Sequence, residues 1–233
     1  MSRDDGNWAK PVKTLDADDR AGAIIGNVRG RRLNAANGGF GRLCQKTFTV
    51  RIGLGATPQA VITTWKTRFG EFWPNGQRMF LTATGIAPGE VGIINSTIPG
   101  VPTMATGVLV VYADDVSFSF MTPEGHPFAG PLTFSAHTDE QGLTVAQVQE
   151  LTRASDPFWE LAMLMPILGE RMQNDIWRST LANLAKHFDA ADPTVESKIV
   201  VVDGHWQWRN AKNIWQNAAI RSGLSAPLRL IRR

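Results

Sequence analysis

The sequence is poor in cysteine and tyrosine, with one residue of each among 233. The single thiol, Cys44, excludes an intramolecular disulfide and a zinc site built from several thiolates. The four histidines show no HxH, HxxxH or histidine–cysteine spacing, which argues against a metal site. There is no GxSxG motif, and Cys44 stands in no recognisable catalytic motif. We therefore name no catalytic residue and expect no metal or other cofactor.

Long apolar runs are also missing. No stretch approaches the roughly 20 apolar residues that a membrane span needs. The N-terminus, MSRDDGNWAK, mixes acids and bases and lacks the apolar centre of a signal peptide. Hydrophobic residues make up 43% of the chain and charged residues 19%, which is ordinary for a globular protein. We expect a cytoplasmic protein of bacterial type with no membrane span.

A nucleotide-binding glycine motif is incomplete. Gly53-Leu54-Gly55 lies between a predicted strand and a predicted helix, where a dinucleotide fingerprint would stand. That fingerprint needs a third glycine at position 58, and Pro58 occupies it. No parallel strand–helix–strand series follows, so these glycines are interpreted as a turn.

Charge is unevenly distributed along the chain. Residues 198–233 contain seven Lys/Arg and one acid, Asp203, whereas the rest holds 17 Lys/Arg and 20 Asp/Glu. The basic tail also carries Trp206, Trp208 and Trp215. Such a tail can dock on the acidic body of its own protein, which is the simpler interpretation, or bind a protein partner or an anionic surface. We do not expect a nucleic-acid partner.

The first part of the chain divides into an arm, a strand and a helix. Residues 1–40 are polar and glycine-rich, which is typical of an irregular arm. From Thr47 to Ile52 apolar and polar residues alternate, which predicts a half-buried strand. Thr57-Pro58 then gives a helix cap followed by proline at the first helical position. The helical segment 57–73 has one apolar face because Val61, Trp65 and Phe69 follow at a spacing of four.

Six further strands are predicted between short turn signals. The separating signals include Ala87-Pro88-Gly89, Asp114-Asp115 and Pro123-Glu124-Gly125. Connections this short favour antiparallel neighbours, because parallel strands need crossovers of a dozen or more residues. The predicted strands are Arg78–Ala83, Val91–Asn95, Thr106–Tyr112, Val116–Phe120, Pro131–Ala136 and Leu143–Val148.

Helix returns after the last of these strands. Ser155 or Asp156 can cap it, with Pro157 near its start, and Pro166 should break or kink it. Beyond that proline an amphipathic pattern predicts a long helix over 167–190. The tail adds a predicted strand over 198–202, an Asp203-Gly204 hairpin turn and a helix over 211–221.

These elements predict an α+β domain over 41–190, between an N-terminal arm (1–40) and a basic, Trp-rich extension (191–233). A seven-stranded antiparallel sheet has one apolar face to cover, and the helix near 167–190 is the long element available. A curved sheet around one helix leaves an apolar cavity unless large side chains fill it. Each candidate lining residue could equally fill a core. The candidates are Trp65, Phe118, Phe120, Phe134, Met165, Met172 and Ile176.

This order of elements resembles the Bet v 1-like, START-related (SRPBCC) superfamily. The segments 47–52, 57–73 and 167–190 are similar to its first strand, first helical segment and C-terminal gripping helix. The motif Gly125-His126-Pro127, with Ser155-Asp156-Pro157 before the last helix, is closest to an uncharacterised bacterial and plant branch of it. Gly130 and Phe134 belong to the same match. The resemblance implies a helix-grip fold.

The resemblance also implies binding of a hydrophobic small molecule, such as a lipid, polyketide or sterol-like compound, without catalysis. The alternatives are a cyclase or dehydratase of the same fold, or an interaction module acting through the basic tail. An enzyme would need polar groups in the cavity, and we consider His126, Glu71 and Tyr112 for this role. His126 lies in a predicted turn, where its imidazole is either a polar cavity group or a hydrogen-bond partner of the backbone.

Overall fold

The structure is a computed structural model that describes residues 4–97, 103–165 and 170–230, without the side chains of 170–172 and 225–230. Most strands belong to one antiparallel sheet with the order β2-β3-β4-β5-β7-β8-β1-β9, and β6 pairs with β8 alone. The strands are β1 (Leu43–Arg51), β2 (Gln77–Phe80), β3 (Val91–Ser96), β4 (Met104–Ala113), β5 (Ser117–Met121), β6 (Phe128–Ala129), β7 (Pro131–Thr138), β8 (Thr144–Ala154) and β9 (Glu196–Asp203).

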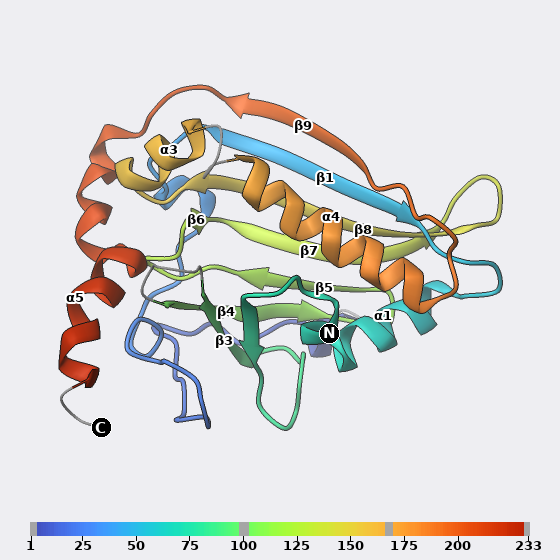
Figure 1. The fold of residues 1–233 in the computed structure, drawn as a ribbon, viewed down its shortest axis with the longest axis horizontal. Helices are drawn as coiled ribbons and strands as arrows, with labels where there is room; N and C mark the ends of the chain where they lie inside the picture. The colour runs from blue at the N-terminus through green and yellow to red at the C-terminus, as the bar shows by residue number, and fades with distance from the viewer. Residues whose placement is uncertain (1–3, 98–102, 166–169, 231–233) are drawn as a thin grey trace.

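One long helix lies along the sheet. Figure 1 shows α4 crossing the face of β1, β8 and β7, with α1 beside its far end. This confirms the predicted α+β helix-grip fold. The remaining elements are short helices at either end of the chain and around the sheet. The helices are η1 (Asp5–Asn7), η2 (Ala36–Gly38), α1 (Pro58–Thr67), α2 (Phe69–Phe72), α3 (Pro157–Leu164), α4 (Glu170–His187), η3 (Trp208–Gln216) and α5 (Ala218–Leu230). None of the described helices is long and apolar enough to cross a membrane.

The predicted helix starts are confirmed by their caps. The Thr57 hydroxyl accepts a hydrogen bond from the Ala60 backbone N–H, and Pro58 follows it in the first turn. The Asp156 carboxylate accepts from the Trp159 N–H in the same way at the start of α3. Both caps satisfy helix N–H groups that would otherwise have no partner.

The gripped face of the sheet is built by residues in register across four strands. Phe48 of β1 lies opposite Val148 of β8, which lies opposite Phe134 of β7, which lies opposite Phe118 of β5. Directly opposed residues of antiparallel strands share a face, so these side chains form one row. The helix α4 covers the row with Leu181, and the resulting cluster is the main core.

The outer face of the sheet carries a second core that the sequence did not predict. Leu15 and Val28 of the N-terminal arm pack on Val91 of β3 and Leu109 of β4. The described part of the arm has almost no regular secondary structure, and it packs along the sheet. Trp8 forms a β-bridge with Tyr112 of β4.

The C-terminal extension continues the same sheet. β9 pairs antiparallel with β1, so the predicted hairpin at Asp203-Gly204 is wrong. The Asp203 carboxylate accepts hydrogen bonds from the backbone N–H of His205 and from Arg153 instead of turning the chain into a second strand. The following residues form η3, and α5 then packs on β4.

Candidate functional site

Two buried side chains of opposite charge lie on the gripped face at the β1–β8 boundary. Lys46 of β1 and Glu150 of β8 are directly opposite in the antiparallel register. Only 5% of Lys46 and 1% of Glu150 is exposed. Charged side chains are rarely buried to this degree unless they are paired and hydrogen-bonded.

Side chains of α4 complete this polar cluster. The Gln173 amide accepts from the Lys46 ammonium at 2.7 Å and donates to both Glu150 carboxylate oxygens, at 3.2 and 2.9 Å. The Trp177 indole N–H donates to Glu150 Oε1 at 2.6 Å, and Asn174 Oδ1 accepts from Lys46 at 3.3 Å. Burial raises the pKa of Glu150, and the charge of Lys46 opposes that rise. The cluster combines a carboxyl group that readily takes a proton with a neighbouring cation.

Trp177 connects the polar cluster to a layer of aromatic rings. Its ring lies 5.5 Å from that of Phe134, which stacks on Phe118 at 4.7 Å with an interplanar angle of 10°. Trp65 and Phe69 of α1 and α2 each make T-shaped contacts with Phe134, at 5.3 Å between centroids. Aromatic pairs in these geometries are favourable beyond the area that they bury. The interior therefore has apolar walls and one polar end.

The rings fill the space that they enclose. Trp65, Phe118 and Phe134 each expose 0% of their surface. A ligand-sized void beside these rings would leave part of their surface exposed. These described side chains thus pack as a closed core. Core filling was the alternative to cavity lining for each of them.

Two tryptophans of this layer have buried indole N–H groups without a hydrogen-bond partner among the described residues. They are Trp65, in the centre, and Trp73, at the margin next to Phe69 and Trp177. The neighbours of Trp65 in T-shaped contact are phenyl rings, whose faces are at most weak acceptors. A buried donor that lacks its acceptor costs about 1–3 kcal/mol.

The structure brings together some of the residues predicted to line a cavity and separates others. Trp65, Phe118, Phe120 and Phe134 belong to the main core, and Ile176 of α4 packs against it with partial exposure. Met165 follows α3 and is 52% exposed. Met172 lies on α4, but its side chain is outside the described residues.

The polar candidates for an enzyme lie apart from one another. Glu71 is at the surface in an ion pair with Arg68, and that pair lowers the pKa of the carboxyl. The Tyr112 hydroxyl donates to Asp114 at 2.6 Å. The His126 Nδ1 accepts from the Phe128 N–H at 3.1 Å within its turn, and burial lowers the pKa of this imidazole to about 4.

The Gly-His-Pro turn has a structural reason for its glycine. Gly125 has a φ of 85°, which favours glycine, and an added Cβ would meet the Gln216 carbonyl oxygen at 2.3 Å. The Gly125 carbonyl also accepts from the Ala218 N–H at 2.9 Å. The turn is therefore a contact point for the C-terminal extension.

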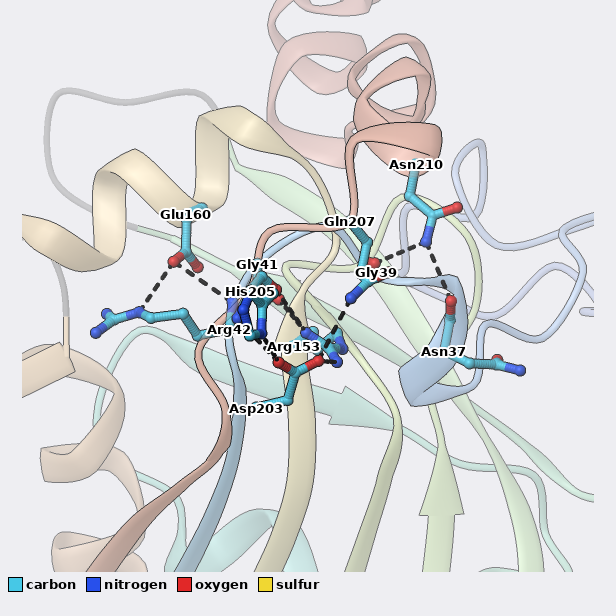
Figure 2. A network of polar contacts seen from close by, with 10 residues as sticks. All are labelled: Asn37, Gly39, Gly41, Arg42, Arg153, Glu160, Asp203, His205, Gln207 and Asn210. Carbon is cyan, nitrogen blue, oxygen red and sulfur yellow. Dashed lines mark hydrogen bonds and ion pairs between the residues drawn. The ribbon is translucent and has the colours of Figure 1, made fainter.

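A polar joint holds that extension to the sheet (Figure 2). The Arg153 guanidinium donates to the Gly41 carbonyl at 2.7 Å, to the His205 carbonyl at 3.1 Å and to the Asp203 carboxylate. The hydrogen bond from Arg153 lowers the pKa of Asp203 well below its usual range. Glu160 of α3 pairs with Arg42 in the same region, at 3.1 Å.

Two surface grooves lie near the ends of the gripped face. The larger, about 800 Å³, is open and lies where the end of β1 meets the segment after α4, with the ion pair Arg51–Asp139 on its wall. The smaller, about 640 Å³, lies between α2 and β2 and is lined by Trp73 and Met79. Because both side chains also pack against the main core, the smaller groove borders the aromatic layer.

Sequence reasoning missed the residues of the polar cluster, which are Lys46, Glu150, Gln173, Asn174 and Trp177. One signal was present. In the alternating pattern of β1 and β8, Lys46 stands two residues before the inward Phe48, and Glu150 two residues after the inward Val148. A charged residue at an inward strand position indicates a buried polar site, because a buried charge needs a partner.

Comparisons with known proteins give a family and several similar solved structures. The chain resembles protein Ms6760 from Mycobacterium smegmatis at 13% identity, covering 62% of this chain and 90% of that one, with a TM-score of 0.45. It resembles the di-domain ARO/CYC StfQ of the steffimycin biosynthetic pathway at 14% identity, covering 63% of this chain and 51% of that one, also with a TM-score of 0.45. Major latex-like protein 151 of Panax ginseng matches at 17% identity over 63% of this chain and 98% of that one, with a TM-score of 0.37.

At these identities and TM-scores the likenesses carry no information on ligand or activity. No relative with a curated function matches the sequence. A family profile described as "Domain of unknown function (DUF1990)" matches residues 49–183, which is more than half of the chain. This protein is therefore a member of the DUF1990 family.

Proposed function

We propose that the protein binds a hydrophobic small molecule that carries a hydrogen-bond-accepting oxygen, between the sheet and α4. The observation that carries the proposal is the indole N–H of Trp65, buried among apolar rings and without a partner in the described part of the chain. A carbonyl or hydroxyl oxygen of a ligand would supply the missing acceptor and recover the cost of leaving this donor unpaired.

Apolar burial would supply most of the affinity. The rings of Phe118, Phe134 and Trp177 offer flat surfaces of the kind that line ligand sites, with a few polar groups to fix orientation. Each Å² of ligand removed from water contributes about 25 cal/mol. The Lys46–Glu150 cluster at the polar end is the group that would discriminate among ligands with different head groups.

Because the rings close the interior, a ligand must displace side chains at its margin. Trp73 stands between the 640 Å³ groove and the aromatic layer, and its own indole N–H also lacks a partner in the described structure. The Asn183 amide holds α2 in place by donating to the Phe72 carbonyl at 3.1 Å. We infer that ligand access runs through this groove and that loosening α2 would favour it.

The test starts with organic extraction of the purified protein and mass spectrometry of the extract, followed by thermal unfolding with an added fatty acid, a sterol and an aromatic polyketide. We expect a co-purifying apolar compound, or a rise in melting temperature with one of the additions. The absence of both would overturn the proposal.

Two variants separate this site from non-specific apolar binding. Trp65→Phe keeps the ring but removes the N–H donor, so ligand affinity should fall roughly three- to tenfold while folding is retained. Asn183→Ala should speed ligand uptake. Trp8→Phe, on the opposite face of the sheet, is the matched control and should leave affinity unchanged. Equal affinity in Trp65→Phe and the parent would contradict the assigned acceptor.

One observation favours a second function, proton transfer to the bound molecule. Glu150 is buried with a raised pKa, is held by two donors and has a cation nearby, which is typical of general acids. If the co-purifying compound is altered by the protein but not by Glu150→Gln, this second function gains support. If neither protein alters the compound, proton transfer is not supported and binding is the only function that remains proposed.

A further inference from the structure

The helix η3 is fastened to the protein body along one side. Asn210 donates its amide to the Gly39 carbonyl at 2.7 Å, and Asn213 donates to the carbonyls of Gly38 at 2.8 Å and Ser155 at 2.9 Å. These two residues are three apart, and a 3₁₀ helix has three residues per turn, so they lie on the same side. The orientation of η3 on the body is therefore fixed.

The same period places a different set of side chains on an outward side. Arg209, Lys212 and Trp215 also follow at a spacing of three, and all of them are exposed. Trp215 is 81% exposed and Trp208, at the start of η3, is 69% exposed. Most of the apolar area of both indoles therefore stays in water and contributes little to folding, although the Trp208 ring also contacts Phe40.

The first turns of α5 continue this surface. Ala218 and Ser222 face the body, and the aliphatic Leu224 is 74% exposed. Arg221 is also exposed, although its Nε donates to Asn27 Oδ1 of the arm at 3.3 Å. Figure 1 shows α5 following η3 at one end of the molecule. We call Trp208, Arg209, Lys212, Trp215, Arg221 and Leu224 together the cationic–aromatic face.

The segment of the sequence that carries this face has charges of one sign. Residues 204–233 contain six Lys/Arg and no Asp or Glu. Cations beside exposed tryptophans and aliphatic side chains suit the boundary of a membrane, where indoles partition to the head-group level and basic residues meet anionic lipids. Single-stranded nucleic acid would use the cations and the rings but would gain nothing from Leu224.

We propose that the cationic–aromatic face binds the surface of an anionic membrane. The protein would lie on the bilayer with η3 and α5 toward the lipid, and the gripped interior of the domain would stay outside it. This inference rests on the exposed side chains of the extension and is independent of the proposed ligand.

The test is flotation of the full chain with vesicles of phosphatidylcholine alone and of phosphatidylcholine mixed with phosphatidylglycerol. We expect binding to the mixed vesicles, weak binding to the neutral ones, and loss of binding when salt rises from about 0.1 M to about 1 M. Each cation near such a surface contributes roughly a fivefold gain in affinity, so the double variant Arg209→Gln, Lys212→Gln should bind roughly thirtyfold more weakly. Trp215→Ala should also weaken binding.

The matched control is the double variant Lys186→Gln, Lys198→Gln, which removes the same charge from exposed positions at the end of α4 and the start of β9. It should bind like the parent. All variants are first checked by circular dichroism, and their targets are exposed side chains. The proposal is overturned if neutral and mixed vesicles bind equally, if the Arg209/Lys212 variant binds like the parent, or if single-stranded RNA binds the face more tightly than the mixed vesicles do.

Discussion

His126 makes the stability of the fold depend on pH in a calculable way. Its imidazole lies in the turn between β5 and β6 with its Nδ1 accepting from the Phe128 N–H, and burial lowers its pKa from 6.5 to about 4. Between about pH 4 and pH 6.5, His126 is therefore mostly neutral in the folded state and mostly protonated in the unfolded chain. Each pKa unit corresponds to about 1.36 kcal/mol, so full protonation disfavours the folded state by about 3 kcal/mol.

The sign and the range follow from linkage. The stabilisation is present above pH 6.5, where the residue is neutral in both states, and is lost as pH falls toward 4, because the unfolded chain then binds a proton that the folded protein does not. Between pH 7 and pH 4.5 this single group should remove about 2.5 kcal/mol from the free energy of unfolding.

The assay is urea denaturation followed by tryptophan fluorescence across that pH range, in the parent and in His126→Asn. Asparagine cannot be protonated here and can still accept the Phe128 N–H, because an Asn side chain commonly bonds to the backbone two residues on. The parent should lose about 2.5 kcal/mol more than the variant. His137→Asn, at an exposed position of β7, is the control and should follow the parent. Identical pH dependence in the parent and His126→Asn would refute the reasoning.

Three further predictions concern buried groups. Arg153→Ala should lower the free energy of unfolding by about 1.5–3 kcal/mol in urea titrations, because it removes the buried donor that the Gly41 and His205 carbonyls share with Asp203; a change below about 1 kcal/mol, on the order of a surface pair, would contradict this. Glu150→Gln should flatten the fall in stability that the parent shows as pH rises above about 4.5, since a raised pKa stabilises the fold only while the carboxyl is protonated; an unchanged profile would show that Glu150 titrates normally. Phe134→Ala should cost about 3–5 kcal/mol and open a cavity that accepts benzene, detected as a benzene-dependent rise in melting temperature; no rise would mean that neighbouring rings collapse into the space.

The elements could be predicted because their signals are local. Alternation marks β1, and the caps Thr57 and Asp156 mark two helix starts, with no need for information from distant parts of the chain. The outer core could not be predicted in this way. Leu15 and Val28 are single apolar residues in a polar segment without a period, so nothing nearby in the sequence indicates that they face Val91.

The candidate site was less predictable than the fold for a related reason. The rings Phe118 and Phe134 are buried, but whether buried rings line a cavity or fill it depends on how closely they interlock in three dimensions. Lys46 and Glu150 meet only because the register of β1 and β8 sets them opposite one another. A sequence shows each charge on its strand but does not show the pairing of strands that are about 100 positions apart.

The segments outside the family match complete the fold of this chain. The profile covers residues 49–183, which leaves out the arm, the first part of β1 and all of β9. Val91 and Leu109 face away from α4 and are covered by Leu15 and Val28 of the arm. An apolar sheet face without such a cover is a site for association with other molecules. The grip of sheet and helix is thus built largely within the matched range, whereas the cover of the outer face and one edge of the sheet depend on residues outside that range.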